Sequence, residues 1–267
     1  MPEWVAFSVD LEPNKDGTLD GIAEAMEWFD DVVPCGTIFA THRIATELPS
    51  VVERLATDHE IGVHVHPREF GHDHDQFAEL DADRQRELLV RTREELAAAG
   101  NIPDEEVTSF RAGRHSASET TFEVLADLGF TIDASINVRY TDYLPETLTR
   151  RQEPFVLEAG LFEVPTTWER PPLFSRVGLR QFPGRDLTAT ASTLRTDRRG
   201  TTGLQCVEWL FSAVEGFSFY MHPYDATDHH DNLQNNGDTF RRRLESLVAD
   251  FDGELVMASN LGDEHRD

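Results

Sequence analysis

The chain has 267 residues, of which 39% are hydrophobic and 28% charged, and its formal net charge is −26. This length is sufficient to close one large hydrophobic core, so we expect a single domain over residues 1–267. The negative charge argues against nucleic acid and anionic membrane surfaces as partners, because phosphate groups would be repelled.

The sequence also indicates where the protein works. No stretch is apolar over the roughly 20 residues that a membrane span needs, and the first residues lack a basic segment followed by a cleavable apolar one. We therefore expect a cytoplasmic protein without a membrane span. Cys35 and Cys206 are isolated in the sequence, so buried thiols are expected in place of a disulfide framework.

The choice and the distribution of charged residues are unusual as well. Lys15 is the only lysine among 24 basic residues, and the acidic residues are spread along the whole chain. Such a surface is typical of adaptation to molar salt, where screening over ~3 Å suppresses self-repulsion. The composition therefore predicts a halophilic source.

Buried strands and amphipathic helices are predicted to alternate through the first half of the chain. We expect strands at residues 4–13, 35–40, 59–67, 107–112 and 130–133, with helices at 19–33, 48–57, 81–99 (ending at Gly100) and 118–129. Residues 68–77 are polar and lack periodicity, so a loop is expected there. Ser118 is a plausible helix N-cap.

The pattern weakens between about residues 136 and 200, where we expect an insertion or a long βα connection that covers part of the site. One strand-like piece lies at 161–165. Alternation then resumes with a helix at 204–214, a strand at 217–221, a helix at 240–249 and a last strand at 254–258. This order predicts an α/β fold of parallel strands, in which functional groups gather at the carboxyl ends of the strands.

Two of the predicted strands end in residues that can bind metal. In the run HEIGVHVHP, alternation of side chains along a strand places His64 and His66 on one face, about 6–7 Å apart. In WVAFSVDLEP the same alternation places Asp10 and Glu12 on one face before a proline. One histidine pair and one carboxylate pair predict a mononuclear metal site.

Five short motifs occur along the chain in the following order: SVDLE, HEIGVHVHP, FRAGRHS, DAS and YMHPYD. The series resembles the NodB-type polysaccharide deacetylases, most closely those with HxHP and HPW or HPY motifs. The resemblance implies an incomplete, distorted (β/α) barrel that uses a divalent metal ion. Mixed histidine and carboxylate ligation suits zinc without excluding other transition ions. It also implies hydrolysis of an N-acetyl group on a sugar or glycan precursor.

The resemblance assigns a role to each matching residue. Asp10 matches the family's general base, but Leu11 occupies the position of the acid that usually binds the metal. Either Glu12 reaches the ion, or Asp10 is itself the ligand. His64 matches the first metal-binding histidine. The usual second position holds an arginine, so His66 is expected to substitute, with His72 and His74 as alternatives.

The later motifs complete the expected site. Arg111 matches an arginine that holds the catalytic carboxylates, and Asp133 matches an acid that orients either Arg111 or the catalytic histidine. His222 matches the general acid, with Asp225 as a candidate orienting partner.

Other interpretations remain open from the sequence. The same fold could hydrolyse a cyclic amide, without metal in some relatives, or could be a non-catalytic carbohydrate-binding module. The acids of the GHDHD segment could form a solvated loop or bind metal. Trp168, Phe174 and Phe182 could stack on sugar rings or pack in the core. The oligomeric state is not indicated.

Overall fold

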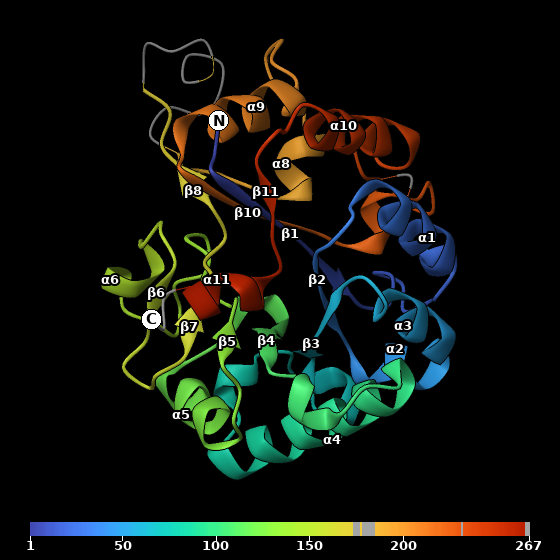
Figure 1. Cartoon of the computed structure of the whole chain (residues 1–267), viewed down its shortest axis with the longest axis vertical. Helices are drawn as coiled ribbons and strands as arrows, with labels where there is room; N and C mark the ends of the chain where they lie inside the picture. Colours follow the sequence, from blue (N-terminus) through green and yellow to red (C-terminus); the bar gives the residue numbers. More distant parts are fainter. Residues whose placement is uncertain (173–176, 178–184, 231, 265–267) are drawn as a thin grey trace.

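A computed structural model describes residues 1–172, 177, 185–230 and 232–264 of the chain. Its centre is a curled, mostly parallel sheet that forms an incomplete (β/α) barrel, as predicted (Figure 1). The parallel strands are β1 (Trp4–Leu11), β2 (Thr37–Ala40), β3 (Glu60–Val65), β4 (Ser109–Ala112), β5 (Ile132–Asp133), β7 (Phe162–Glu163), β10 (Gly216–Met221) and β11 (Glu254–Leu255).

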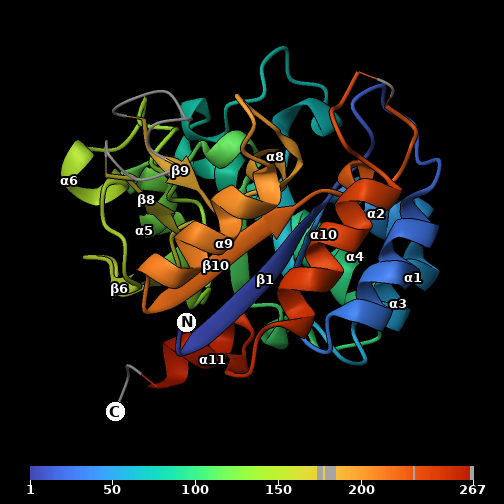
Figure 2. The ribbon, with the colours of Figure 1, turned by 90° about the horizontal axis from the view of Figure 1, so that it is seen from above.

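The strands follow the order β10-β1-β2-β3-β4-β5-β7-β6, with β6 (Phe155–Val156) antiparallel to β7 and β11 paired with β1. Every residue of β1 except Trp4 is buried, as expected for a parallel strand that is covered on both faces. Figure 2 shows β1 and β10 side by side through the middle of the molecule. The strands that carry Asp10 and precede His222 are therefore direct neighbours.

Helices cover the outer face of the barrel (Figure 1). They are α1 (Ile22–Val32), α2 (His42–Glu47), α3 (Pro49–Leu55), α4 (Ala82–Gly100), α5 (Glu119–Asp127) and α10 (Asp238–Ala249), with α9 (Gly203–Ala213) beside β10. Ser118 caps α5, as predicted, in a reciprocal pair with Thr121. The predicted end of α4 is one residue early, because Asn101, with φ of 52°, takes the left-handed position expected of Gly100.

Two local predictions differ from the structure around the histidine strand. A short helix, α2, precedes α3, and Thr41 caps its N-terminus by accepting a hydrogen bond from Ile44 N at its side chain. The loop at 68–77 is bounded by 3₁₀ turns, η1 (Pro67–Phe70) and η2 (Phe77–Glu79). Strand β3 ends at Val65, so His66 lies just beyond it.

The segment at 136–200, predicted to be an insertion or a long βα connection, contains several short helices and strands, one of which joins the main sheet. It contains α6 (Glu146–Thr149), β6, β7, the hairpin strands β8 (Trp168–Glu169) and β9 (Leu187–Thr188), and α8 (Ala191–Arg195). Strand β7 extends the main sheet beside β5. Trp168 is buried, as core packing requires, whereas Phe174 and Phe182 lie outside the described residues.

A helix that was not predicted from the sequence, α11 (Ala258–Glu264), closes the end of the barrel at which the strands begin. Its first turn is anchored there, since Ala258 N donates to Thr37 Oγ1 (2.9 Å) and Ser259 N to Glu60 Oε2 (3.1 Å). Figures 1 and 2 show this helix across the barrel end, near the start of β1. The opposite end, where the strands finish, holds the candidate site.

Two further expectations can be compared with the structure. Cys35, which is half-buried, and Cys206, which is buried, are both free thiols. Among the described residues, no helix combines the length and the apolarity that crossing a membrane requires.

Candidate metal and catalytic site

A buried ion pair connects two strands at the carboxyl end of the barrel. Arg111 Nη1 of β4 donates to Asp10 Oδ1 of β1 across 2.7 Å, and both side chains are buried. Arg111 is fixed further by its Nε hydrogen bond to Ala134 O (2.9 Å) and by the Phe39 ring, 4.3 Å beneath its guanidinium. Burial raises the pKa of Asp10, but Arg111 and nearby histidines lower it below its ordinary value. Asp10 is therefore ionised at neutral pH.

A second cluster lies beside this pair. Glu12, His64 and His66 each offer one ligand atom, and these atoms lie within 4.8 Å of one another. Glu12 Oε2 is 2.6 Å from His66 Nε2 and 3.6 Å from His64 Nε2, and the two Nε2 atoms are 3.1 Å apart. Leu11, by contrast, is fully buried in the hydrophobic core. Glu12 therefore lies with the histidines, whereas Asp10 is bound to the arginine and is not part of this cluster.

The far side of each imidazole is held by an acceptor. His64 Nδ1 lies 2.7 Å from the carbonyl oxygen of Arg111, and His66 Nδ1 lies 2.8 Å from Asp75 Oδ2. Because these oxygens can only accept, both Nδ1 atoms carry a hydrogen, and both Nε2 atoms face Glu12, where a metal ion could displace a proton and bind them. Acceptors on the outer nitrogen are typical of histidines that bind metal.

Close packing of the backbone also fixes His66. A Cβ atom on Gly113 would lie 2.5 Å from Val65 O and 3.0 Å from two carbons of the His66 ring. Only glycine leaves space for the ring at this position, so the glycine of the FRAGRHS motif places the second histidine.

The charges of the cluster suit a cation. Burial lowers the pKa of His66, but Glu12 and Asp75 together raise it to about 10. Burial raises the pKa of Glu12, but His66 and His64 lower it well below its ordinary value. A positive charge is thus favoured between these groups, and a divalent ion would supply it in place of the proton. Two imidazole nitrogens and one carboxylate form a donor set that fits Zn²⁺ and similar ions.

His222 follows β10 and faces both carboxylates. Its Nε2 is 3.6 Å from Glu12 Oε1 and 3.8 Å from Asp10 Oδ2, while its Nδ1 is 3.5 Å from Asp225 Oδ2. Its ring stacks on Tyr224 at 4.6 Å. Burial lowers the pKa of His222, but Asp225, Glu12 and Asp10 raise it above its ordinary value. This imidazole is set up to carry a proton.

One residue of this group was not found from the sequence. Arg195, at the end of α8, is buried and places Nε 2.7 Å from Asp225 Oδ1. It belongs to the segment at 136–200, which has no motif that would have indicated it. A buried arginine therefore holds the carboxylate that contacts His222.

Asp133 differs from its expected role. Its carboxylate accepts hydrogen bonds from Ser135 Oγ (2.6 Å) and Ser135 N (3.2 Å), and it also shares a hydrogen bond with Glu163. Burial and Asp133 raise the pKa of Glu163 well above its ordinary value, so Glu163 carries the shared proton. Asp133 organises the loop after β5, and Arg111 is bonded to Asp10 and Ala134 O. The direct bond expected from Asp133 to Arg111 or to the catalytic histidine is not found among its described contacts.

The alternative histidines lie elsewhere. His72 Nε2 accepts from Arg84 Nε at 3.0 Å, and His74 Nδ1 is 3.8 Å from Glu79 Oε2. The GHDHD segment is nevertheless not a fully solvated loop, because its Asp75 side chain is 12% exposed and bonds to His66. The signal for the Asp75–His66 contact in the sequence is an acidic residue nine positions after His66.

A cavity of about 200 Å³ opens beside the site, lined by Gln76, Arg114, His115, Ser116, Ala117, Tyr140, Asp142, Tyr143 and Leu144. His115 stacks on Tyr140 (4.9 Å) and meets the edge of Tyr220 (5.0 Å). The Tyr220 ring in turn lies 5.3 Å from the guanidinium of Arg111. The cavity is thus linked to the ion pair through aromatic side chains.

Comparisons with known proteins agree with this architecture. Residues 26–132 match the family model described as polysaccharide deacetylase. Among curated proteins, none matches the chain.

Solved structures resemble it over nearly its whole length. A polysaccharide deacetylase-like protein from Mycobacterium smegmatis has 18% sequence identity and a TM-score of 0.64, with 98% of this chain and 90% of that one covered. A CE4 family pseudoenzyme from Bacillus anthracis has 14% identity and a TM-score of 0.57, with coverage of 98% and 66%. The peptidoglycan N-acetylglucosamine deacetylase Bc1960 has 13% identity and a TM-score of 0.56, with coverage of 97% and 87%.

At these identities the structural likeness concerns the fold. The fold, the match of residues 26–132 and the motif series at the strand ends all point to the same kind of distorted barrel. Residues 26–132 thus match the polysaccharide deacetylase family, and the chain as a whole is similar in fold to these solved structures.

Proposed function

We propose that this protein is a metal-dependent hydrolase that removes an N-acetyl group from a sugar or glycan precursor. The observation that carries the proposal is the convergence of Glu12, His64 and His66 on one point, next to the Asp10–His222 pair. Such a site combines a place for a divalent ion with a base and an acid.

Glu12, His64 and His66 are the residues proposed to hold the ion, and zinc is the proposed ion because its common ligands include histidine and carboxylate. A bound divalent ion would polarise the acetyl carbonyl and lower the pKa of a water molecule to about 7. The family's usual acid is replaced by Leu11, and the place of Glu12 beside both histidines supports it as the substitute.

Asp10 is the proposed general base. Its Oδ1 is occupied by Arg111, which leaves Oδ2 to accept the proton of the attacking water. The guanidinium keeps the carboxylate ionised before the reaction and prevents it from rotating away.

His222 is the proposed general acid. When water forms the new C–O bond and the amide C–N bond breaks, the departing nitrogen needs a proton, which His222 Nε2 can donate. The products are acetate and a free amine. The raised pKa of His222 supports this role, since the imidazole is protonated before it acts.

The cavity beside the site is proposed to receive part of the sugar. Its lining combines the aromatic rings of Tyr140 and Tyr143 with the polar groups of Gln76 and Arg114, a mixture that suits a hydroxyl-bearing ring.

The direct test uses purified protein that is stripped of metal and reloaded with Zn²⁺. We expect acetate and primary amine to be released in equal amounts from N-acetylglucosamine oligomers, and release to stop after chelation. His222→Ala should retain metal and oligomer binding but lose turnover.

The same assays separate the rival functions. Hydrolysis of cyclic amides by metal-free protein, with no acetate from acetylated sugars, would favour the cyclic-amide alternative. Oligomer binding without turnover in the loaded wild type would favour a non-catalytic module, and the similar fold of the B. anthracis pseudoenzyme makes this control necessary.

A further inference from the structure

Two loops near the candidate site bring together a second group of metal-binding side chains. Asp16 lies in the loop between β1 and α1, and His229 and His230 lie in the loop between η5 (Pro223–Asp225) and α10. One ligand atom from each of the three residues lies within 4.8 Å of the others. We propose that Asp16, His229 and His230 form a second divalent-cation site, separate from Glu12, His64 and His66 and independent of the proposed hydrolysis.

The carboxylate of this site is held in place by its own loop. Asp16 Oδ1 accepts from Thr18 N (3.0 Å) and from Thr18 Oγ1 (2.8 Å), and Asn14 Nδ2 donates to the same hydroxyl at 3.1 Å. The other oxygen, Oδ2, points across to the second loop and lies 2.8 Å from His229 Nε2. A ligand that is fixed before the ion arrives loses little conformational entropy on binding.

His230 supplies a donor that is otherwise unsatisfied. Its Nε2 is buried and has no hydrogen-bond partner within the described part of the chain. The ring is packed edge-on against His229 at 5.0 Å and Tyr224 at 5.6 Å, which limits its rotation. A buried polar atom without a partner is unfavourable, and a metal ion would relieve it.

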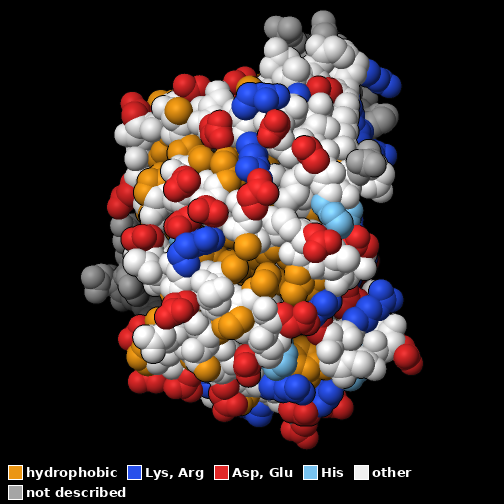
Figure 3. All heavy atoms as spheres, turned by 90° about the vertical axis from the view of Figure 1, so that its right-hand side faces the viewer, with side chains coloured by type: hydrophobic (Ala, Val, Ile, Leu, Met, Phe, Trp, Pro, Cys, Tyr) orange, Lys and Arg blue, Asp and Glu red, His pale blue; other side chains and the backbone are white. Residues whose placement is uncertain are grey.

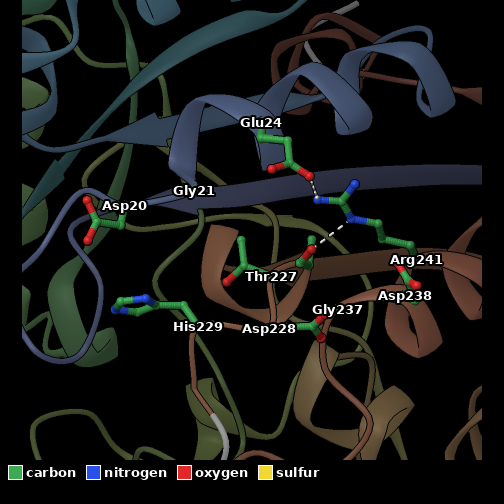
Figure 4. A pocket seen from close by; sticks show the side chains of 10 residues that line it. Asp20, Gly21, Glu24, Thr227, Asp228, His229, Gly237, Asp238 and Arg241 are labelled. Atoms are coloured by element: carbon green, nitrogen blue, oxygen red, sulfur yellow. Dashed lines mark hydrogen bonds and ion pairs between the residues drawn. The ribbon is translucent and has the colours of Figure 1, made fainter.

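The surroundings of the site are acidic. His229 stands at the edge of a cavity of about 310 Å³ whose lining includes Asp20, Glu24, Asp228 and Asp238. Figure 4 shows His229 beside Asp20 at one side of this cavity, whereas Arg241 lies at the other side and is paired with Glu24. The excess of carboxylates raises the local concentration of cations. Imidazole and carboxylate ligands suit zinc, cobalt and nickel ions.

An ion bound at this second site would connect two loops that lead away from the candidate catalytic site. The loop of Asp16 begins at Glu12, and the loop of the two histidines follows η5, the turn that comes directly after His222. Tyr224 stacks on His222 at 4.6 Å and also makes an edge-to-face contact with His230 at 5.6 Å. An ion shared by Asp16, His229 and His230 would therefore tie together the two loops that position the proposed ligand and the proposed acid.

The test measures how many ions the full-length protein binds. Chelator-stripped protein is titrated with Co²⁺, followed by visible absorbance, and the bound Zn²⁺ is counted after equilibrium dialysis. We expect two ions per wild-type chain, and one in the double variant His229→Ala/His230→Ala. His64→Ala should lose the other ion and keep this one, and His42→Ala, a histidine outside both groups, should keep both.

Asp16→Asn provides a milder test in case the double variant unfolds, since it retains both imidazoles. We expect it to weaken one class of sites at least tenfold and to leave the other unchanged. The proposal is overturned if the folded variants at 16, 229 and 230 bind as many ions as wild type with equal affinity, or if wild type binds one ion that His64→Ala abolishes. Failure of acetate release would leave these counts unaffected, so the two proposals can fail separately.

Discussion

Asp10 and Arg111 form an ion pair of 2.7 Å that is almost wholly removed from solvent, with 5% and 2% of their side chains exposed. They lie on β1 and β4, with β2 and β3 between them in the sheet. The pair therefore spans the mouth of the barrel and fixes the carboxylate that is proposed to act as base.

Removing the arginine should leave a buried charge without its partner. We expect Arg111→Met to lower the free energy of unfolding at pH 7 by about 3–5 kcal/mol, as measured by urea denaturation. Because the folded-state pKa of Asp10 is lowered below 3.8, the pair stabilises the fold above that pH and loses its contribution as the carboxylate protonates below it. The loss in the variant should thus shrink at acidic pH.

Arg86→Met is the matched control for this prediction. Arg86 pairs with Asp127 at 2.9 Å on the surface, where both side chains are well exposed. Its removal should change stability by at most about 1 kcal/mol. If both variants lost the same free energy of unfolding, the buried pair would contribute no more to stability than the surface pair.

The contact between Asp75 and His66 leads to a prediction about metal affinity. Asp75→Asn retains the shape of the side chain but removes the charge that holds Nδ1–H of His66. We expect the affinity of the Glu12–His64–His66 site to fall about 10- to 100-fold, measured by competition with a chromophoric chelator. Asp73→Asn, an exposed neighbour, should leave affinity unchanged, and an equal effect of both changes would contradict the assignment.

The proposed base and acid predict a bell-shaped pH profile of kcat/KM. Asp10 must be ionised, so activity should fall as the pH drops through its pKa, which is lowered below 3.8. His222 must be protonated, so activity should fall as the pH rises through its pKa, which is raised above 6.5. His222→Gln should remove the alkaline limb. A rate that instead increases through the titration of His222 would mean that it acts as a base.

Much of this site follows from local pattern. The strand patterns of β1, β3 and β4 placed Asp10, His64 and Arg111 near the strand ends, and parallel strands present their last residues at one edge. The same rule predicted His64 and His66 about 6–7 Å apart along the backbone. From that backbone spacing the two side chains converge, so that their Nε2 atoms lie 3.1 Å apart while both outer nitrogens contact acceptors.

The remaining parts depend on contacts that no short pattern specifies. Arg195 contacts Asp225 from a segment without periodicity, and α11 closes the barrel by donating backbone N–H hydrogen bonds to the side chains of Thr37 and Glu60. Such contacts arise only when distant segments pack. The cytoplasmic location, the single-domain organisation and the halophilic source stay predictions.

The acidic surface allows a test of salt adaptation. Figure 3 shows Asp and Glu side chains scattered over the face on the right of Figure 1. With a net charge of −26, self-repulsion should destabilise the fold in dilute buffer. We expect the unfolding temperature to rise steeply between about 0.1 M and 1 M KCl, where the Debye length falls from about 10 to 3 Å. Full structure and activity in dilute buffer would contradict this.

Arg195 is expected to act as a positioning residue for the acid. Its guanidinium lies 2.7 Å from Asp225, whose other oxygen is 3.5 Å from His222 Nδ1. Two side chains hold its backbone, since Asn235 Nδ2 and Arg243 Nη1 donate to Arg195 O at 2.7 and 3.1 Å. Loss of this support would let Asp225 and then His222 shift, and small displacements of a reacting group can lower a rate up to about 100-fold.

Arg195→Met should therefore reduce kcat by up to about 100-fold while KM changes little, because the residue does not touch the proposed sugar cavity. Arg195→Lys retains the positive charge and should recover part of the rate. Arg242→Met, on the exposed side of α10, serves as the control. If Arg195→Met lowers the unfolding temperature but leaves kcat intact, the arginine supports only the fold. A fall in kcat in Arg195→Met that is partly restored in Arg195→Lys would instead show that Arg195 positions His222 through Asp225.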